Sequence, residues 1–166
     1  MKKLVYFLVL AVSFAAVILV AIFGTRPQGI VECIYIDTIK IKPSDESVYQ
    51  EESDTESAKM ILVYDKNEEL EYDGSFYMPY IFKTEISPLD VTNRSFSYYI
   101  DDVSKSYMDF PPQSENASKN GAFLIKRVTN KQFIVVDVHC RALDGGKAKI
   151  DTLRVIIDYR SVYYEE

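Results

Sequence analysis

The stretch that decides the fold is FIVVDVHCRALDGGKAKIDTLRVIIDY, residues Phe133 to Tyr159. Apolar and polar residues alternate on both sides of Asp144-Gly145-Gly146, a pattern that predicts two antiparallel strands joined by a turn. The buried face of the first strand is expected to hold Ile134, Val136, Val138, Cys140 and Ala142. The second strand is expected to bury Ile150, Leu153, Val155 and Ile157. Since Ile150 and Leu153 differ in phase, a β-bulge is indicated near Thr152.

The rest of the chain after residue 29 has the same character. Short strands are expected at residues 30–41, 60–64, 75–87, 95–101 and 121–128, and turn-rich segments separate them. Pro79 favours an edge strand or a bulge in its segment, and residues 109–119 are expected to form a loop. No sustained helical period is present here. The pattern predicts an all-β sandwich over residues 30–161, with an acidic insertion around 43–57 and a short tail at 162–166.

The opening of the chain has a different character. Leu4 to Phe23 contains no charged residue and is long enough for one transmembrane helix, so residues 1–29 are predicted to be a signal anchor followed by a linker. Lys2 and Lys3 precede it, which places the N-terminus in the cytoplasm and the domain outside. A signal peptide that is cleaved, giving a secreted domain, is the alternative. Ala21 and Gly24 do not form a clean cleavage site, which favours the anchor.

Charge excludes one class of partner. The net charge is −6, and once Lys2 and Lys3 are set aside the remaining chain has 17 basic and 25 acidic side chains. A chain of this balance lacks the basic stripe that phosphate backbones require, so no nucleic acid is expected as a partner.

The order of signals from Ile36 onward resembles the group 2 bacterial immunoglobulin-like domains. The matching stretches are IDTIKIKP (36–43), ISPLDVTNRSFSYYIDD (86–102), and GAFLIKR (121–127) followed by the final hairpin. The usual Trp of that family is replaced by the pair Tyr98 and Tyr99, and the acidic segment is an insertion. The resemblance implies an immunoglobulin-like sandwich and a role in cell-surface adhesion or spacing. It implies no catalytic residues.

No catalytic, cofactor or metal site is expected from the residue types. His139 is the one histidine, and in a strand its side chain points to the face opposite that of Cys140, so the two cannot act as a dyad. The acidic residues between 45 and 56 lack the pattern of a calcium loop. Asp101 and Asp102 diverge at a strand end. The chain is therefore expected to be non-enzymatic.

Cys33 and Cys140 are the two cysteines. Outside the cytoplasm they could form a disulfide, which would close a loop on the order of 100 residues and contribute about 4–5 kcal/mol. Two free thiols are the alternative that the sequence leaves open.

Tyrosine is the best indication of a binding surface, because it supplies large contact area at low entropic cost. The candidates are Tyr77, Tyr80, Tyr98, Tyr99 and Tyr107, with Tyr72 nearby; an ordinary place in the strands is the competing interpretation.

The predicted anchor and sandwich are compatible with two functions. One is an anchored extracytoplasmic module that binds an unidentified protein or glycan at the cell surface. The other is an accessory subunit of a membrane or envelope complex, assembled through its transmembrane helix at residues 4–23.

Overall fold

The computed structural model describes residues 32–45, 50–51 and 58–163. Ile34–Glu166 belong to one compact unit. The predicted anchor at residues 4–23 and most of the acidic insertion lie outside the described residues. Within the described part, no helix has the length and apolar character needed to span a membrane.

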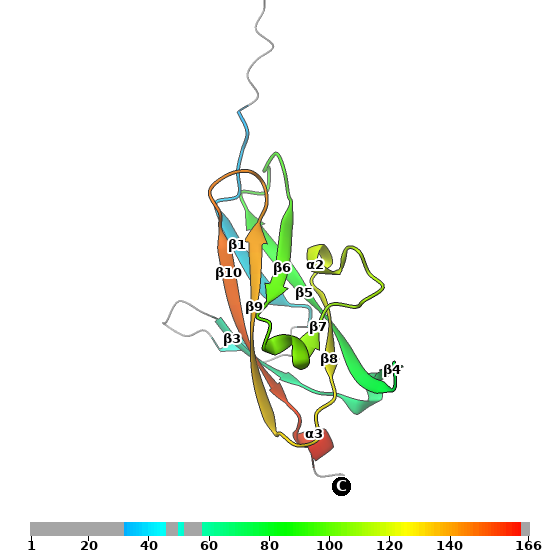
Figure 1. Cartoon of the computed structure of the whole chain (residues 1–166). Helices are drawn as coiled ribbons and strands as arrows, with labels where there is room; N and C mark the ends of the chain where they lie inside the picture. Colours follow the sequence, from blue (N-terminus) through cyan, green and yellow to red (C-terminus); the bar gives the residue numbers. More distant parts are fainter. Residues whose placement is uncertain (1–31, 46–49, 52–57, 164–166) are drawn as a thin grey trace, which may run out of the picture. The chain divides into compact units, whose positions relative to one another are not determined.

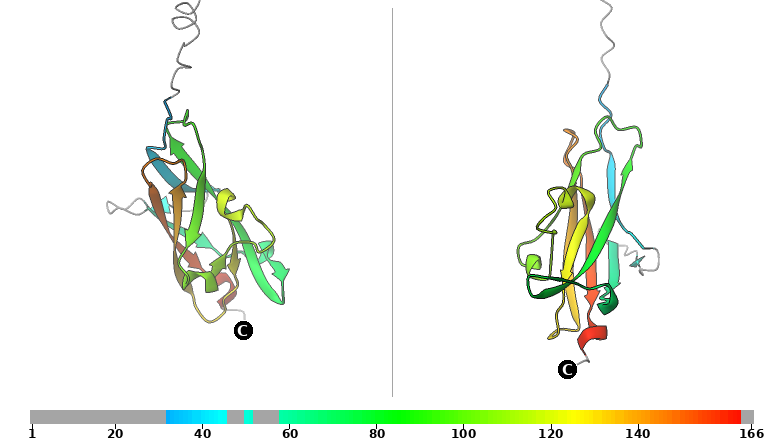
Figure 2. Two further views of the ribbon diagram at one scale, coloured as in Figure 1. Left: turned by 45° about the horizontal axis from the view of Figure 1, so that its top comes forward. Right: turned by 90° about the vertical axis from the view of Figure 1, so that its right-hand side faces the viewer.

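Two sheets make up the domain, as Figures 1 and 2 show. The first has the order β1 (Thr38–Pro43), β5 (Ser75–Ser87), β8 (Ala122–Lys126) and β7 (Met108–Asp109), and β4 (Leu70–Tyr72) pairs with the start of β5. The second has the order β2 (Gln50–Glu51), β3 (Ala58–Val63), β10 (Ile150–Asp158), β9 (Phe133–Ala142) and β6 (Phe96–Ile100). All pairs are antiparallel except β3 with β10. The prediction of an all-β sandwich is confirmed.

The core lies between the sheets because alternate residues of each strand point inward. All five residues predicted for the buried face of β9 are buried. Aromatic rings fill the centre, where Phe82 of β5 contacts Tyr98 of β6 and Phe123 of β8 at centroid distances of 6.4 and 5.6 Å. Burying one such side chain contributes roughly 1.5–3 kcal/mol. The helical segments are short: η2 (Lys66–Glu68), η3 (Ser104–Ser106), α2 (Ala117–Asn120) and α3 (Arg160–Tyr163).

The bulge expected near Thr152 is absent, and β9 and β10 pair without a break from Ile150↔Arg141 to Asp158↔Phe133. Ile150 points outward and is 53% exposed, so its predicted burial is wrong. The inward position next to it holds Asp151, whose carboxylate accepts a hydrogen bond from the backbone N–H of Ile41 in β1 at 2.7 Å. The inward Asp151 interrupts the apolar alternation of β10, and in the sequence this interruption looked like a β-bulge although the strand is regular.

The first strand begins later than expected, at Thr38. The residues before it are fixed by loops instead of a sheet. Ile34 and Thr92 exchange two hydrogen bonds, from Ile34 N–H to Thr92 Oγ1 and from Thr92 N–H to the Ile34 carbonyl. Ile36 donates its N–H to the Asp144 carboxylate and its side chain is buried. These contacts hold the segment in place without a strand partner.

Pro79 lies in a strand that is interior to its sheet, yet its position is locally an edge. On one side β5 pairs with β8, including Pro79↔Leu124. On the other side β4 pairs with residues 75–77 and β1 pairs with residues 82–87. Within the described residues, residues 78–81 thus have a strand neighbour on one side alone, where a missing N–H is tolerated.

The loop predicted at 109–119 contains part of β7 and the start of α2. Gly121 ends α2 with φ 66°, and a Cβ there would lie 2.6 Å from the Phe82 carbonyl oxygen. At the C-terminus, Val162 is buried in the core and Ser161 Oγ donates to the Tyr64 carbonyl at 2.6 Å. The predicted boundary between domain and tail at 161/162 is therefore too early, because α3 belongs to the domain.

Candidate functional site

The five candidate tyrosines do not form one surface. Tyr98 is 2% exposed and belongs to the core, so it is wrongly assigned to a binding surface. Tyr80 points inward from β5 and packs against Phe82 at 4.9 Å between ring centroids. Tyr99 lies on the outer face of the second sheet, stacked on His139 at 4.8 Å. Tyr77 and Tyr107 belong to the first sheet and its connection.

Tyr77 and Tyr107 do come together, in a groove of about 260 Å³ that also contains Tyr72, Phe110 and Lys126. Lys131 fixes Tyr107, because its ammonium donates to the phenol oxygen at 2.8 Å and lies 4.8 Å from the ring centroid. This contact lowers the pKa of Tyr107. The groove is lined by Tyr rings and by the side chains of Lys105 and Lys126.

The centre of the core contains a polar cluster that links the two sheets. Tyr98 of β6 and Thr84 of β5 share a hydrogen bond of 2.5 Å between their hydroxyls. Thr84 Oγ1 is also 3.8 Å from Cys140 Sγ of β9, and Cys140 pairs directly with Tyr98 across the strands. The three residues are named the Thr84 cluster below.

Both cysteines are free thiols, and the bridge between Cys33 and Cys140 that the sequence left open is not present in the structure. Cys33 is exposed and Cys140 is fully buried. Burial raises the pKa of the Cys140 thiol to about 12. Because the thiolate is the reactive form, Cys140 is protected from thiol reagents while the domain is folded.

His139 lies on the outer face of the sheet and Cys140 on the inner one, so the predicted separation of the two side chains is confirmed. The imidazole Nδ1 is 2.8 Å from Thr152 Oγ1. Asp102 forms an ion pair with Lys105 at 2.7 Å. In the residues with a described placement, no three His, Cys, Asp or Glu side chains gather in a group that could hold a metal ion.

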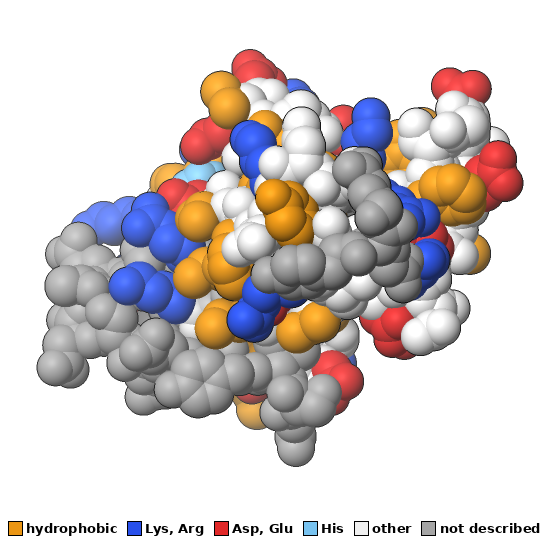
Figure 3. All heavy atoms as spheres, turned by 90° about the horizontal axis from the view of Figure 1, so that it is seen from below, with side chains coloured by type: hydrophobic (Ala, Val, Ile, Leu, Met, Phe, Trp, Pro, Cys, Tyr) orange, Lys and Arg blue, Asp and Glu red, His pale blue; other side chains and the backbone are white. Residues whose placement is uncertain are grey.

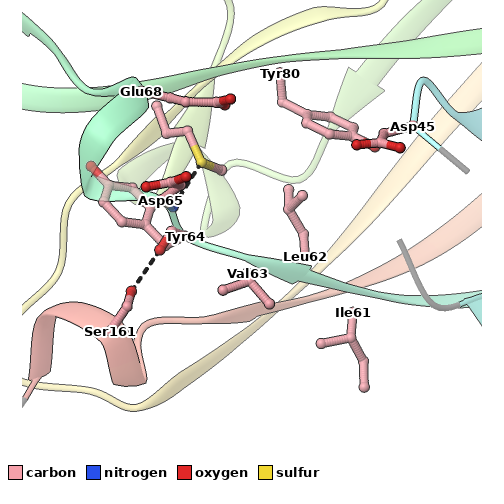
Figure 4. Close-up of a pocket in the computed structure, with 10 residues that line it drawn as sticks. Asp45, Ile61, Leu62, Val63, Tyr64, Asp65, Glu68, Tyr80 and Ser161 are labelled. Atoms are coloured by element: carbon pink, nitrogen blue, oxygen red, sulfur yellow. Dashed lines mark hydrogen bonds between the residues drawn. The ribbon is translucent and has the colours of Figure 1, made fainter. Parts of the chain in front are cut away.

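A cavity of about 500 Å³ opens between β3 and β5 (Figure 4). Apolar side chains of Leu62, Met78 and Tyr80 line it, and Asp45, Asp65 and Glu68 add carboxylates. Ser161 lies at its lower side in Figure 4, where it bonds the Tyr64 backbone. The Ser161 hydroxyl donates its proton to the Tyr64 carbonyl and not to one of these carboxylates.

Tyr64 connects this cavity to a buried ion pair. The Arg127 guanidinium is 3.5 Å from the Glu69 carboxylate, whose side chain is 8% exposed. Burial, followed by the nearby Glu69 carboxylate, raises the pKa of Tyr64. A buried pair of this kind is costly to break but is ordinary in a structural role.

The outer face of the second sheet carries an apolar row that was not among the predicted sites. Ile61 of β3, Ile156 of β10 and Val135 of β9 lie side by side in register. Val63 and Phe133 occupy the next row, on either side of Asp158. The exposed fractions are 38% for Ile61, 55% for Val135, 58% for Val63 and 46% for Phe133. These five residues are named the apolar face.

Charged pairs border the apolar face. Arg154 forms a bidentate ion pair with Asp137, with nitrogen–oxygen distances of 2.8 and 2.9 Å. Arg160 binds Asp158 at 2.6 Å and places its guanidinium 5.1 Å from the Phe133 ring centroid. Seen from the end that carries α3, hydrophobic side chains lie among Lys and Arg side chains (Figure 3).

A sequence signal for the apolar face existed in the consecutive apolar runs MILV (60–63), FIVV (133–136) and VII (155–157). A sheet with one solvated face normally alternates, whereas strands covered on both faces read as continuous apolar runs. Three adjacent strands share this feature. The exposed apolar residues of the β4–β5 hairpin do not share one face: Leu70 and Tyr72 lie on one side and Phe76 on the other.

Comparison of the chain with protein-family models, with curated proteins and with solved structures finds no match.

Proposed function

We propose that the chain is a non-enzymatic, membrane-anchored module with an immunoglobulin-like sandwich that lies outside the cytoplasm and binds a protein through the apolar face. The apolar face is the observation that carries this proposal. Five apolar side chains in two adjacent rows, bordered by ion pairs, have the composition of an interaction surface: an apolar centre with a polar rim. Four of the five side chains are aliphatic, which favours a protein surface over a glycan.

The strand order supports the immunoglobulin-like assignment. The first sheet, β1-β5-β8-β7, corresponds to strands A-B-E-D of the constant-type immunoglobulin sandwich. In the second sheet, β10-β9-β6 corresponds to strands G-F-C. Tyr98 is buried on the strand that corresponds to C, where that fold commonly buries a Trp. Cys140 is on the strand that corresponds to F, and Thr84 takes the facing position on the strand that corresponds to B.

Binding through the apolar face is tested with a matched pair of variants. Ile81 on the outer face of the first sheet is 54% exposed, against 55% for Val135. A photo-crosslinking residue at position 135 in intact cells should give a discrete adduct with a protein, and the same residue at position 81 should give none. Val135→Lys should then abolish the interaction with the identified partner, and Ile81→Lys should leave it intact. Equal crosslinking from both positions, or from neither, contradicts the proposal.

Placement outside the cytoplasm is tested with the two thiols. A membrane-impermeant maleimide should label one thiol per chain in intact cells, because Cys33 is exposed and Cys140 is buried. Cys33→Ser should remove this labelling, and Cys140→Ser should not. Labelling of Cys33 that requires cell lysis would place the domain in the cytoplasm. The mass of the labelled chain distinguishes an anchor that is retained from a signal peptide that is cleaved. Assembly through the segment 4–23 stays a prediction.

A further inference from the structure

One end of the domain is the point at which the chain from the N-terminal segment arrives. Ile34 and Thr92 exchange two hydrogen bonds of 2.9 Å. The backbone N–H of Ile36 donates to the Asp144 carboxylate. Thr92 belongs to the β5–β6 connection and Asp144 to the β9–β10 connection. In Figure 1 these two loops and the start of the described chain lie together at the upper end.

The loops at this end form one fixed surface. Leu143 donates its N–H to the Ser95 carbonyl at 2.8 Å and thereby joins the two connections. Tyr35 lies against the β9–β10 turn so closely that a Cβ added to Gly146 would be 2.9 Å from its side chain. Residues 34–35, 88–95 and 143–149 are named the tether pole.

The tether pole exposes apolar side chains at loop positions. Leu89 is 75% exposed, Leu143 49%, Tyr35 46% and Ile34 37%. Arg94, Lys147 and Lys149 lie among them in the same loops, against Asp90 and Asp144. The Asp144 carboxylate is engaged by the N–H groups of Ile36 and Gly146. The pole is thus slightly cationic, whereas the chain after Lys3 is strongly acidic.

The length of the tether limits how far this surface can lie from the apolar segment. Ten residues, Gly24 to Cys33, separate the apolar segment that ends at Phe23 from Ile34. Whatever their conformation, they span at most about 40 Å. If Leu4 to Phe23 crosses the bilayer, as the proposed function requires, Ile34 and the tether pole lie within about 40 Å of the membrane surface.

We propose that the tether pole docks on the lipid surface of the membrane that holds the anchor, with Leu89 and Leu143 entering the boundary between headgroups and acyl chains. Apolar side chains at loop tips, a Tyr and nearby cations are the combination that favours this boundary. The contact orients the domain: β9 leads away from the pole at Ala142, so Phe133 and the rest of the apolar face are presented away from the bilayer. The inference rests on the proposed anchor.

The chain contains no Trp, so a single introduced Trp reports its own surroundings. Leu89→Trp probes the tether pole. Val103→Trp is the matched control, since Val103 is 80% exposed. β6 starts at Phe96, next to the tether pole, and Val103 comes after its far end at Ile100. The full-length chain is reconstituted in vesicles of phosphatidylcholine and phosphatidylglycerol that carry brominated acyl chains, and flotation is measured on the same samples.

The L89W emission should shift to the blue and be largely quenched by the brominated lipid, while V103W should keep its emission. Equal quenching of both variants overturns it, because the domain then has no preferred pole on the bilayer. If both variants float with the vesicles and neither is quenched, the docking is wrong while the anchor stands. A chain that does not float with the vesicles overturns the anchor, and the docking with it.

Discussion

The hydroxyl of Tyr98 lies 2.5 Å from Thr84 Oγ1, so a side-chain hydrogen bond crosses the core from the second sheet to the first. Cys140 lies within 3.8 Å of the same threonine oxygen. This cluster is a specific polar connection between β5 of the first sheet and β6 and β9 of the second. Burial of the Tyr98 ring raises the pKa of its phenol.

Removal of either hydroxyl should destabilise the domain, and by unequal amounts. Thr84→Val leaves the Tyr98 phenol buried without its partner, at a cost of about 1–3 kcal/mol. Tyr98→Phe should cost about 1 kcal/mol, because Thr84 keeps its contact with Cys140. The double variant should lose less than the sum of the two. Urea unfolding of residues 34–166 measures all three free energies; strict additivity would show that the hydroxyls are not coupled.

Thr84→Cys should create a disulfide with Cys140 between the two sheets. The oxygen and sulfur are already 3.8 Å apart, so a modest shift brings two sulfurs to bonding distance. Closing the loop between these positions contributes about 4 kcal/mol in the chain-entropy model, against which the lost hydrogen bond to Tyr98 must be set. Thiol counting in denaturant should find Cys33 alone as a free thiol. Under oxidising conditions, a chain that still shows three free thiols would refute this geometry.

Asp151 should matter for the attachment of β1. Its carboxylate accepts the Ile41 N–H at 2.7 Å and so ties an edge strand of the first sheet to β10 of the second. Asp151→Ala leaves that N–H without its partner and should cost about 1–3 kcal/mol. Asp151→Asn retains an acceptor oxygen and should cost clearly less. Hydrogen exchange at Ile41 gives the local readout, and unchanged protection in the Ala variant would argue against the contact.

Acid should weaken the attachment of the segment that precedes β1. The N–H of Ile36 holds the pKa of Asp144 below its usual range. Since the folded pKa is below the unfolded one, the unfolded chain binds the proton first as the pH falls. The stabilisation is complete above the unfolded pKa, near 3.9, and is lost as the pH falls through the folded pKa. Asp158, whose pKa is lowered by Arg160, acts in the same direction.

The Asp144 contribution is isolated by comparing the pH dependence of the unfolding free energy in the natural chain and in Asp144→Asn. The variant should show a shallower loss of stability below about pH 4. Parallel curves would mean that the Ile36 contact does not favour the ionised carboxylate. Asp90→Asn, in the neighbouring loop, serves as a control with the same change of charge.

The sequence predicted strands well where alternation was complete and failed where a polar side chain pointed inward. All five predicted inward residues of β9 are buried, because that strand has no polar residue in phase with them. In β10 the inward Asp151 disguised the phase and suggested a bulge. Nothing local in the sequence distinguishes an inward Asp from a change of register, because its partner, Ile41, is 110 residues away.

The site was harder to predict than the fold. Tyr98 and Tyr99 are neighbours in sequence, yet one belongs to the core and the other to the surface, as strand geometry requires. Clustering of tyrosines along the chain therefore did not distinguish Tyr77 and Tyr107, which share a groove, from Tyr98, which belongs to the core. The apolar face consists of residues from three strands that are far apart in sequence. In each strand the signal was a run of consecutive apolar residues in place of alternation. Which of these residues lie side by side depends on the register between the strands, and the sequence alone does not give that register.

Tyrosine ionisation should divide into early and late groups. Burial raises the pKa values of Tyr64, Tyr98 and Tyr159, whereas Lys131 lowers that of Tyr107. In the folded domain these three phenols should keep their protons beyond the normal pKa near 10, while Tyr107 ionises first. Since the unfolded chain releases protons that the folded one retains, stability should fall as the pH rises above about 10.

The near-ultraviolet absorbance of phenolate follows this titration. The late step should coincide with unfolding, and it should lose one of its three tyrosines in Tyr98→Phe, while Tyr107→Phe should remove only an early one. A titration in which all tyrosines ionise together, before the domain unfolds, would contradict the burial of these rings.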